Sequence, residues 1–264
     1  MLRKLLKYDL KYMLKNMAVF YILSLIFAVT TRILFNINQS VIISIISQIS
    51  VGALFSILAS TLINTIMRSW IRFRDSLYKD ESYLTNTLPV TKKELYNSKI
   101  IQTFIFFFIS FIIILISLFI TYYSKDNWLI ITEYIKSITT GLNINIQVFI
   151  ISILLLIFLE VFNAIQCGFY GIILGYKRNS NKLGYSILIG FIIYLIAQIM
   201  VLVLIFIYGL FDSTIMDLFK TTTMVIEASS FKLLLALTST LYFIIIFIMS
   251  ILCKFELNKG LNIE

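Results

Sequence analysis

Long stretches without a charged side chain alternate with short charged segments along the whole chain. Residues 137–176 carry a single charge, Glu160, and five other stretches carry none, namely residues 16–31, 33–67, 100–124, 183–211 and 233–253. About 20 consecutive apolar residues suffice for a helix to cross the hydrocarbon core of a bilayer. The pattern therefore predicts an all-α membrane protein, a single transmembrane domain over residues 1–264 with six transmembrane helices at 17–35, 41–67, 100–123, 147–175, 185–211 and 233–253.

A different pattern precedes the first span. Residues 2–16 combine leucine and methionine with lysine and arginine at helical spacing, so that apolar side chains share one face and basic side chains the other. A helix of this kind lies in the head-group layer of a membrane with its apolar side toward the acyl chains. We therefore expect an amphipathic interfacial helix over residues 1–16, which either anchors the topology or also contacts a partner.

Composition and charge agree with membrane insertion. Hydrophobic residues make up 60% of the chain, charged residues 13%, and the mean hydropathy is +0.97. Of the 22 lysines and arginines, seventeen fall in the N-terminal segment, in residues 68–99 and 177–182, and in the C-terminal tail. Basic residues favour the cytoplasmic side of a membrane, which predicts that both termini lie inside. The net charge of +9 then reflects topology and attraction to anionic membrane lipids, and we expect no nucleic-acid partner.

Residues 68–99 form the longest polar insertion between two spans, and they contain the only proline of the chain, Pro89. Proline disfavours a helical conformation of the residue before it. We therefore expect a first short helix, including Asp80 to Thr87, that ends near Pro89. Within it, Tyr83 and Leu84 are candidates for exposed apolar side chains.

The residues after Pro89 carry a helix-start signal. Thr91 and Glu94 have the spacing of a capping box, in which each side chain bonds the backbone amide of the other residue. We expect a second helix that starts at Lys92 and continues into the third span.

Three glycines stand three and four residues apart in the fourth span. Glycine pairs at this spacing let another helix backbone approach closely. We expect a packing contact there, either within the chain or between subunits, at Gly168, Gly171 and Gly175.

Glu160 is the one acidic residue inside a predicted span. Asn163 and Gln166 follow it at intervals of three residues, on roughly the same helix face. A carboxylate at the centre of a bilayer costs about 2.5–3.5 kcal/mol, so it marks a functional position or is bound by a neighbouring helix. The three residues are therefore candidates for a translocation path or for a hydrogen-bonded contact between helices.

Several kinds of chemistry are excluded by what the sequence lacks. The chain has no histidine, so it has no histidine general base and no His-ligated metal site. It also has no G-x-x-x-x-G-K-[ST] motif and therefore no P-loop for ATP. Its two cysteines, Cys167 and Cys253, are expected to pack in the membrane without a disulfide. We expect no catalytic residue, no metal and no bound cofactor in this chain, and no enzymatic activity of its own.

The polar insertion resembles a known family. The basic N-terminal helix, the six spans and the segment Tyr83-Leu84-Thr85-Asn86-Thr87-Leu88-Pro89-Val90-Thr91-Lys92-Lys93-Glu94-Leu95 together resemble the type-2 ABC exporter permeases of Gram-positive bacteria. The segment Lys182–Ser186 and the ending Asn258–Glu264 look similar too, so the resemblance extends over essentially the whole chain. Leu88-Pro89-Val90 is its most distinctive part.

The resemblance implies a membrane-spanning subunit that exports an amphipathic or hydrophobic substrate, with peptides among the candidates, across the bacterial cytoplasmic membrane. Two six-span subunits, identical or different, would act with separate cytosolic P-loop ATPase subunits that bind ATP and Mg. The loop between spans two and three would supply a coupling helix seated in a groove of the ATPase. The residues thereby placed at the ATPase are Arg72, Arg74, Lys79, Asp80, Glu81, Tyr83, Leu84 and Thr87, with Tyr83 and Leu84 as anchors.

Other function classes remain open. Ion-coupled secondary transporters often contain helices broken at mid-membrane by glycine or proline in corresponding positions of two repeats, which this sequence lacks. A membrane enzyme would need an unusual mechanism without histidine or paired intramembrane carboxylates. A non-transporting immunity or scaffold protein is compatible with the same sequence.

Overall fold

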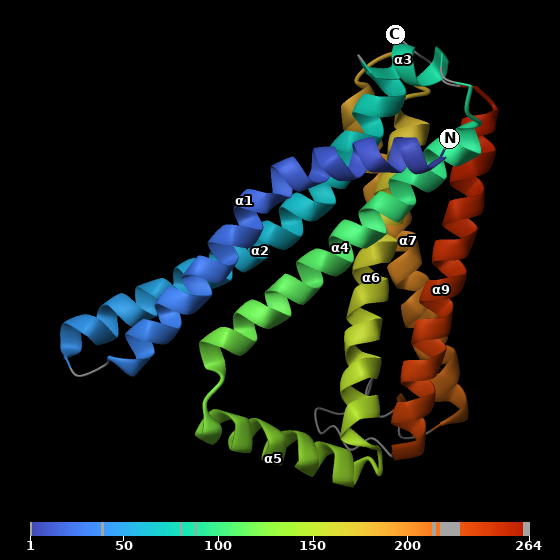
Figure 1. The fold of residues 1–264 in the computed structure, drawn as a ribbon. Helices are drawn as coiled ribbons and strands as arrows, with labels where there is room; N and C mark the ends of the chain where they lie inside the picture. Colours follow the sequence, from blue (N-terminus) through green and yellow to red (C-terminus); the bar gives the residue numbers. More distant parts are fainter. Residues whose placement is uncertain are drawn as a thin grey trace. The chain divides into compact units, whose positions relative to one another are not determined.

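The computed structural model describes residues 2–37, 40–79, 81–87, 89–212, 215–216 and 228–260. Within these ranges the chain is helical and contains no β-strand (Figure 1). The helices are α1 (Leu2–Asn36), α2 (Val41–Tyr78), α3 (Glu81–Thr87), α4 (Lys92–Tyr122), α5 (Lys125–Gly141), α6 (Ile146–Gly175), α7 (Lys182–Phe211) and α9 (Ala228–Asn258). Asp80, Leu88 and the last four residues, which the sequence analysis singled out, lie outside the described residues.

Six of these helices, α1, α2, α4, α6, α7 and α9, are long and apolar enough to cross a membrane. They coincide with the six predicted spans, which indicates a multi-pass membrane protein. Each helix has enough residues to satisfy its backbone hydrogen bonds internally across the hydrocarbon layer.

Several helices extend beyond their apolar stretches. Residues 2–16 are continuous with the first span in the single helix α1, because no proline or glycine interrupts the chain before Asn36. Likewise α2 continues past Met67 to Tyr78, so that much of the polar insertion 68–99 prolongs the flanking helices. Only the short helix α3 and the joints on either side of it lie between them.

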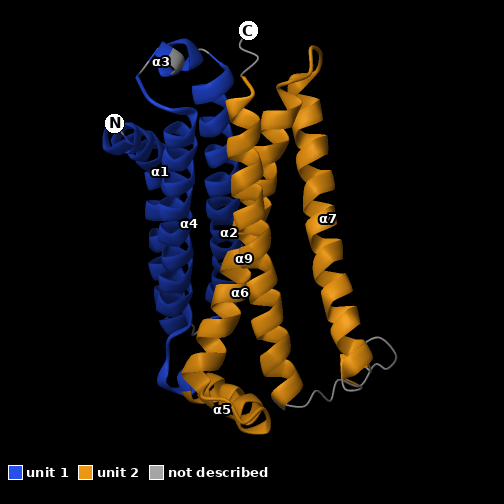
Figure 2. Ribbon diagram, turned by 90° about the vertical axis from the view of Figure 1, so that its right-hand side faces the viewer, with its two compact units in different colours: residues 1–128, 263–264 blue, residues 129–262 orange. Residues whose placement is uncertain are grey.

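The described residues divide into two compact units, coloured separately in Figure 2. In the first unit, which runs to Trp128, α1 packs against α2 and α4, and α2 packs against α4 and α3. Apolar side chains from α1 and α4 meet at Met13, Met17 and Phe106. Hydroxyl groups join α1, α2 and α4 deeper in the unit, where Ser110 of α4 shares hydrogen bonds of 2.8 Å with Tyr21 of α1 and 2.7 Å with Thr65 of α2.

The second unit begins at Leu129 and is built around α6, which packs against α7 and α9. Its buried clusters combine side chains of all three helices, for example Cys167, Ala197 and Met249. In the contact with α7 the two backbones approach closely at glycines. A methyl group at Gly171 would lie 2.6 Å from the Cα of Gly190, and one at Gly175 would lie 2.5 Å from the Cα of Ser186.

The third glycine of the predicted set, Gly168, lies at the same crossing. Its Cα would be 3.5 Å from a methyl group placed on Gly190. The three glycines thus meet α7 within the chain. Their role is steric, because a side chain at Gly171 or Gly175 would need space that the α7 backbone already fills.

We expect Gly171→Ala to destabilise the second unit. Its methyl group would meet backbone atoms, which have no flexible end to move aside, and overpacking of this kind costs about 1–3 kcal/mol. Gly52→Ala is the matched control, because nothing lies within 4 Å of a methyl group at that position of α2. Thermal unfolding of the purified protein in detergent measures both changes. Equal midpoints for the two variants would contradict the close crossing of α6 and α7.

Candidate functional site

Helix α3 presents two large apolar side chains at the polar end of the first unit. Tyr83 is 62% exposed and Leu84 is 73% exposed. The opposite side of the helix faces inward, since Ser82 is fully buried. Exposed apolar side chains outside the apolar stretches of a membrane protein are candidates for contact with a partner.

Helix α4 follows α3 in the chain and begins with a capping box. The amide of Glu94 donates to Thr91 Oγ1 at 3.2 Å, and the amide of Thr91 donates to Glu94 Oε2 at 2.9 Å. The predicted capping box is therefore confirmed, with α4 starting at Lys92. Glu94 lies in the polar first turn, ahead of the apolar stretch, and the hydrogen bond from the Thr91 backbone lowers the pKa of its carboxyl group.

Next to α3 lies a buried cluster of charged groups at the polar end of the first unit. Asp9 of α1 is only 2% exposed, and its Oδ1 accepts from Arg72 Nε of α2 at 2.9 Å and from Lys99 Nζ of α4 at 2.5 Å. Asp9 Oδ2 accepts from the Ser98 hydroxyl at 2.9 Å. Arg72 Nη1 also donates to Glu81 Oε2 of α3 at 2.6 Å. We call Asp9, Arg72, Lys99 and Glu81 the ion cluster.

Two members of the ion cluster, Arg72 and Glu81, are residues that the family resemblance assigned to the contact with an ATPase. Arg72 is 8% exposed and both of its acidic contacts lie within the chain, so it supports α3 from the interior. Glu81 is its second partner and forms the first turn of α3. Lys79 and Thr87 are exposed, whereas Arg74 is half-buried and pairs with its neighbour Asp75 at 2.7 Å.

Sequence reasoning missed Asp9 and Lys99. A signal was present, because Asp9 stands four residues before Met13 and eight before Met17, in helical register with the buried face of α1. An acid in line with buried apolar residues requires a buried cation. Five lysines and arginines dominate the pattern of residues 2–16, and the single acid on the apolar side stands out little among them.

The intramembrane polar residues lie in the second unit. Glu160 is half-buried, while Asn163 and Gln166 are almost completely buried. Gln166 Nε2 lies 3.5 Å from Ser250 Oγ of α9, and Asn163 Oδ1 accepts a weak hydrogen bond from Cys167. Nearby, Tyr242 of α9 donates to Gln198 of α7 at 3.3 Å. Polar side chains from three helices thus meet in the middle of this unit.

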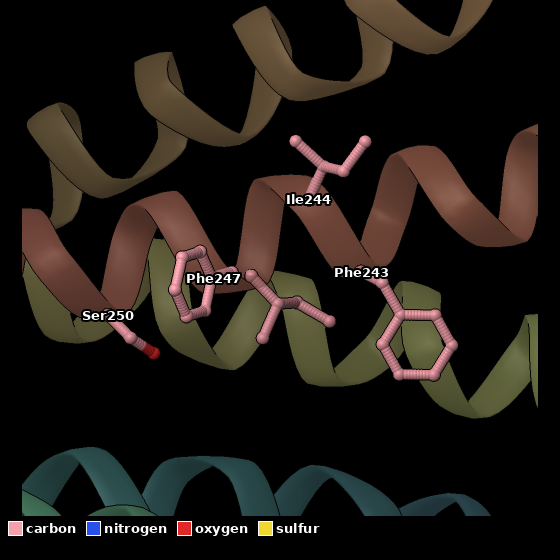
Figure 3. A pocket seen from close by; sticks show the side chains of 5 residues that line it. Phe243, Ile244, Phe247 and Ser250 are labelled. Atoms are coloured by element: carbon pink, nitrogen blue, oxygen red, sulfur yellow. The ribbon is translucent and has the colours of Figure 1, made fainter.

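An apolar pocket lies along α9, and Figure 3 shows the side chains that line it. They are Phe243, Ile244, Ile246, Phe247 and Ser250. Four of the five are hydrocarbon side chains, so the pocket suits an apolar group. It offers no acid or base for chemistry. Among the residues that the structure describes, no group of three metal-ligating side chains comes together.

We expect Asp9→Asn to destabilise the first unit strongly, because it leaves Arg72 and Lys99 as two buried cations with one remaining carboxylate. Removing one partner of a buried ion pair costs about 3–5 kcal/mol. Adding Lys99→Met restores charge balance and should recover part of the lost stability. Asp75→Asn is the matched control, whose more exposed pair should matter by less than about 1 kcal/mol. Thermal unfolding measures the stability of all three variants. If the double variant is no more stable than Asp9→Asn, the assigned pairing of Asp9 with Lys99 is contradicted.

No protein-family model, no curated protein and no solved structure matches this chain. Its function therefore has to be inferred from the chemistry of its own residues. The inference rests on two features. One is the exposed pair Tyr83 and Leu84 on α3, next to the ion cluster, and the other is the set of polar residues around Glu160.

Proposed function

We propose that this chain is the membrane-spanning subunit of an ABC exporter in a bacterial cytoplasmic membrane. It acts with separate cytosolic P-loop ATPase subunits, which bind ATP and Mg, and with a second six-span subunit, identical or different. Its substrate is an amphipathic or hydrophobic compound, for which peptides are candidates. The chain itself supplies the membrane path and the contact with the ATPase.

The observation that carries this proposal is the placement of Tyr83 and Leu84. Both are exposed on a short helix between two membrane-spanning helices, at the polar end of the first unit. A water-exposed tyrosine and leucine side by side gain free energy when a partner covers them, by about 25 cal/mol for each Å² of apolar surface removed from water. Aromatic side chains of this kind are common anchors in protein interfaces.

The charged residues around α3 suit an acidic partner surface. Lys79 is exposed and Arg74 is half-buried, so both side chains can reach outward, although Arg74 also pairs with Asp75. Arg72 and Glu81 have a different role in the proposal, because they hold α3 on the first unit. With both termini inside the cell, α3 faces the cytoplasm, where an ATPase would bind.

The proposal places the energy source on a partner subunit. The chain has no P-loop, so hydrolysis of ATP has to occur on a partner. ATP-driven closure of two ATPase subunits would move α3, and α3 would move the helices to which it is attached. An ion-coupled carrier is the alternative, and it would run without any ATPase.

We expect Tyr83→Ala with Leu84→Ala to uncouple ATP hydrolysis from transport, because the pair supplies the apolar anchor for the ATPase. Transport should fall at least tenfold while membrane insertion is unchanged. The measurement is ATP hydrolysis and substrate export in vesicles that contain the chain together with the proposed P-loop ATPase subunit. Tyr134→Ala with Leu129→Ala on α5 is the matched control, since these side chains are also exposed, at 70% and 58%.

Two outcomes would contradict the proposal. The first is wild-type transport by the Tyr83 and Leu84 variant. The second is transport by the purified chain alone that is insensitive to ATP depletion and abolished by an uncoupler, which would instead support an ion-coupled carrier.

We expect Glu160→Gln to fold like the wild type, because an amide and a carboxyl group have nearly the same shape. If Glu160 lines the translocation path, export should fall several-fold with unchanged thermal stability. Glu133→Gln on the exposed surface of α5 is the matched control. A wild-type export rate would assign Glu160, with Asn163 and Gln166, to packing between helices.

A further inference from the structure

Helix α5 differs from the other long helices in the part of the chain that the structure describes. It has 17 residues, of which four are charged, namely Lys125, Asp126, Glu133 and Lys136. A helix needs about 20 mainly apolar residues to cross the hydrocarbon core of a bilayer. Helix α5 therefore connects two membrane-spanning helices, α4 and α6, without crossing the membrane itself.

The two joints of α5 tie it to one side of the membrane. Residues 123–124 link it to the end of α4, and residues 142–145 link it to the start of α6. Because α4 and α6 are consecutive spans, α4 leaves the membrane on the side where α6 enters it. Joints this short reach at most about 18 Å, whereas a helix of this length is about 25 Å long. Held near the same side at both ends, α5 has to run along the membrane surface.

Hydrogen bonds attach α5 at both of its ends. At the start, the hydroxyl oxygen of Ser124 accepts from the amide of Asn127 at 3.0 Å. Beyond the other end, the amide of Ile144 donates to the carbonyl oxygen of Thr139 at 3.0 Å. Both joints therefore have a defined conformation, so that the helix presents one particular side to the membrane.

Apolar and polar side chains occupy opposite sides of α5. The apolar face consists of Trp128, Ile131, Ile135 and Ile138, which follow one another at intervals of three and four residues. Of these, Trp128, Ile131 and Ile138 are 48%, 44% and 46% exposed, so the apolar face stays open along the helix in the described chain. The polar side chains on the opposite side are Asp126, Glu133, Ser137 and Thr140.

Aromatic residues at the junction of α4 and α5 show which way the apolar face points. The centroid of the Trp128 ring lies 6.4 Å from that of Phe119 and 6.1 Å from that of Tyr123. Phe119 belongs to the last turn of the membrane-spanning helix α4. Tryptophan and tyrosine are enriched where the hydrocarbon layer meets the head groups. The side of α5 that carries Trp128 is therefore turned toward the hydrocarbon, and the polar side toward water.

The charges of α5 favour a lipid surface without a net charge. Its two lysines and two acidic residues sum to zero. Amphipathic helices that bind anionic lipids usually carry a surplus of lysine and arginine on the polar side. Since α5 has no such surplus, its association with a membrane has to come from burying apolar surface, at about 25 cal/mol for each Å².

We propose that α5 is an interfacial helix that docks on the lipid surface where α4 ends and α6 begins, with its apolar face inserted among the upper acyl chains. The side chains that enter the lipid are Trp128, Ile131 and Ile138. With both termini inside the cell, this surface belongs to the outer leaflet. The inference concerns the lipid contact of this chain and does not depend on the proposed function.

The chain is suited to a fluorescence test, because it has only two tryptophans, Trp70 and Trp128. Replacing both by phenylalanine gives a background into which one tryptophan at a time is introduced. Each variant of the full chain is placed in nanodiscs of phosphatidylcholine, a lipid without net charge. Phosphatidylcholine brominated in the upper part of its acyl chains quenches tryptophans that reach the hydrocarbon. Iodide quenches those that face water.

The introduced tryptophans compare the two sides of α5. Ile131→Trp and Ile138→Trp lie on the apolar face, and Leu129→Trp and Ser137→Trp are matched controls at exposed positions away from it. An interfacial helix buries its apolar face about 5–10 Å into the boundary of the acyl chains. We therefore expect the brominated lipid to quench the first pair about twofold or more strongly than the controls, and iodide to show the reverse order.

Three results would overturn the lipid docking of α5. If iodide quenches Ile131→Trp and Ile138→Trp as strongly as the controls, the apolar face lies in water. If both variants are protected from both quenchers, a protein surface such as a second copy of the chain covers this face. If the brominated lipid quenches them only after anionic lipid is added, charge and not apolar insertion holds the helix. Should these variants fail to fold, Trp70→Phe alone leaves Trp128 on the apolar face, and the same two quenchers decide.

Discussion

The carboxylate of Asp9 holds four segments of the first unit at one point. It lies on α1, binds Arg72 of α2 and Lys99 of α4 directly, and reaches Glu81 of α3 through Arg72. A buried ion is tolerated only where oppositely charged and hydrogen-bonding groups surround it. The helices α1, α2 and α4 therefore have to meet in one register at this level. The apolar contacts of Met13 and Met17 and the hydroxyl contacts of Ser110 continue that register deeper into the unit.

The helices of the second unit are held together by different interactions. Lipid chains are as apolar as leucine, so helices in a bilayer gain little from burying hydrocarbon against each other and depend on close packing and hydrogen bonds. Here α6 and α7 meet through Gly171, Gly175 and Gly190, where the absence of side chains lets the backbones touch. Polar groups such as Gln198 and Tyr242 add hydrogen bonds between α7 and α9. The first unit is thus fixed mainly by charge and the second mainly by shape.

The sequence predicted the parts that depend on local pattern. The six apolar helices follow from the spacing of charges, and the start of α4 follows from the Thr91–Glu94 capping box. What escaped prediction depends on contacts between distant segments. Asp9 and Lys99 are separated by 90 residues, and nothing local marks them as partners. Arg72 was predicted to contact a partner because it belongs to the charged insertion 68–99, yet it lies in the continuation of α2 to Tyr78 and is buried there.

The chemistry of the link to α3 has a mechanical consequence for any partner that binds Tyr83 and Leu84. Apolar side chains slide past one another with small changes in energy, whereas the energy of the Arg72–Glu81 pair changes with the distance between its two charges. A force on α3 would therefore reach the ion cluster through that pair. From Arg72 it would pass to Asp9 and Lys99, and so to α1 and α4 together. In our proposal this is why a helix of seven residues can act on membrane-spanning helices more than four times its length.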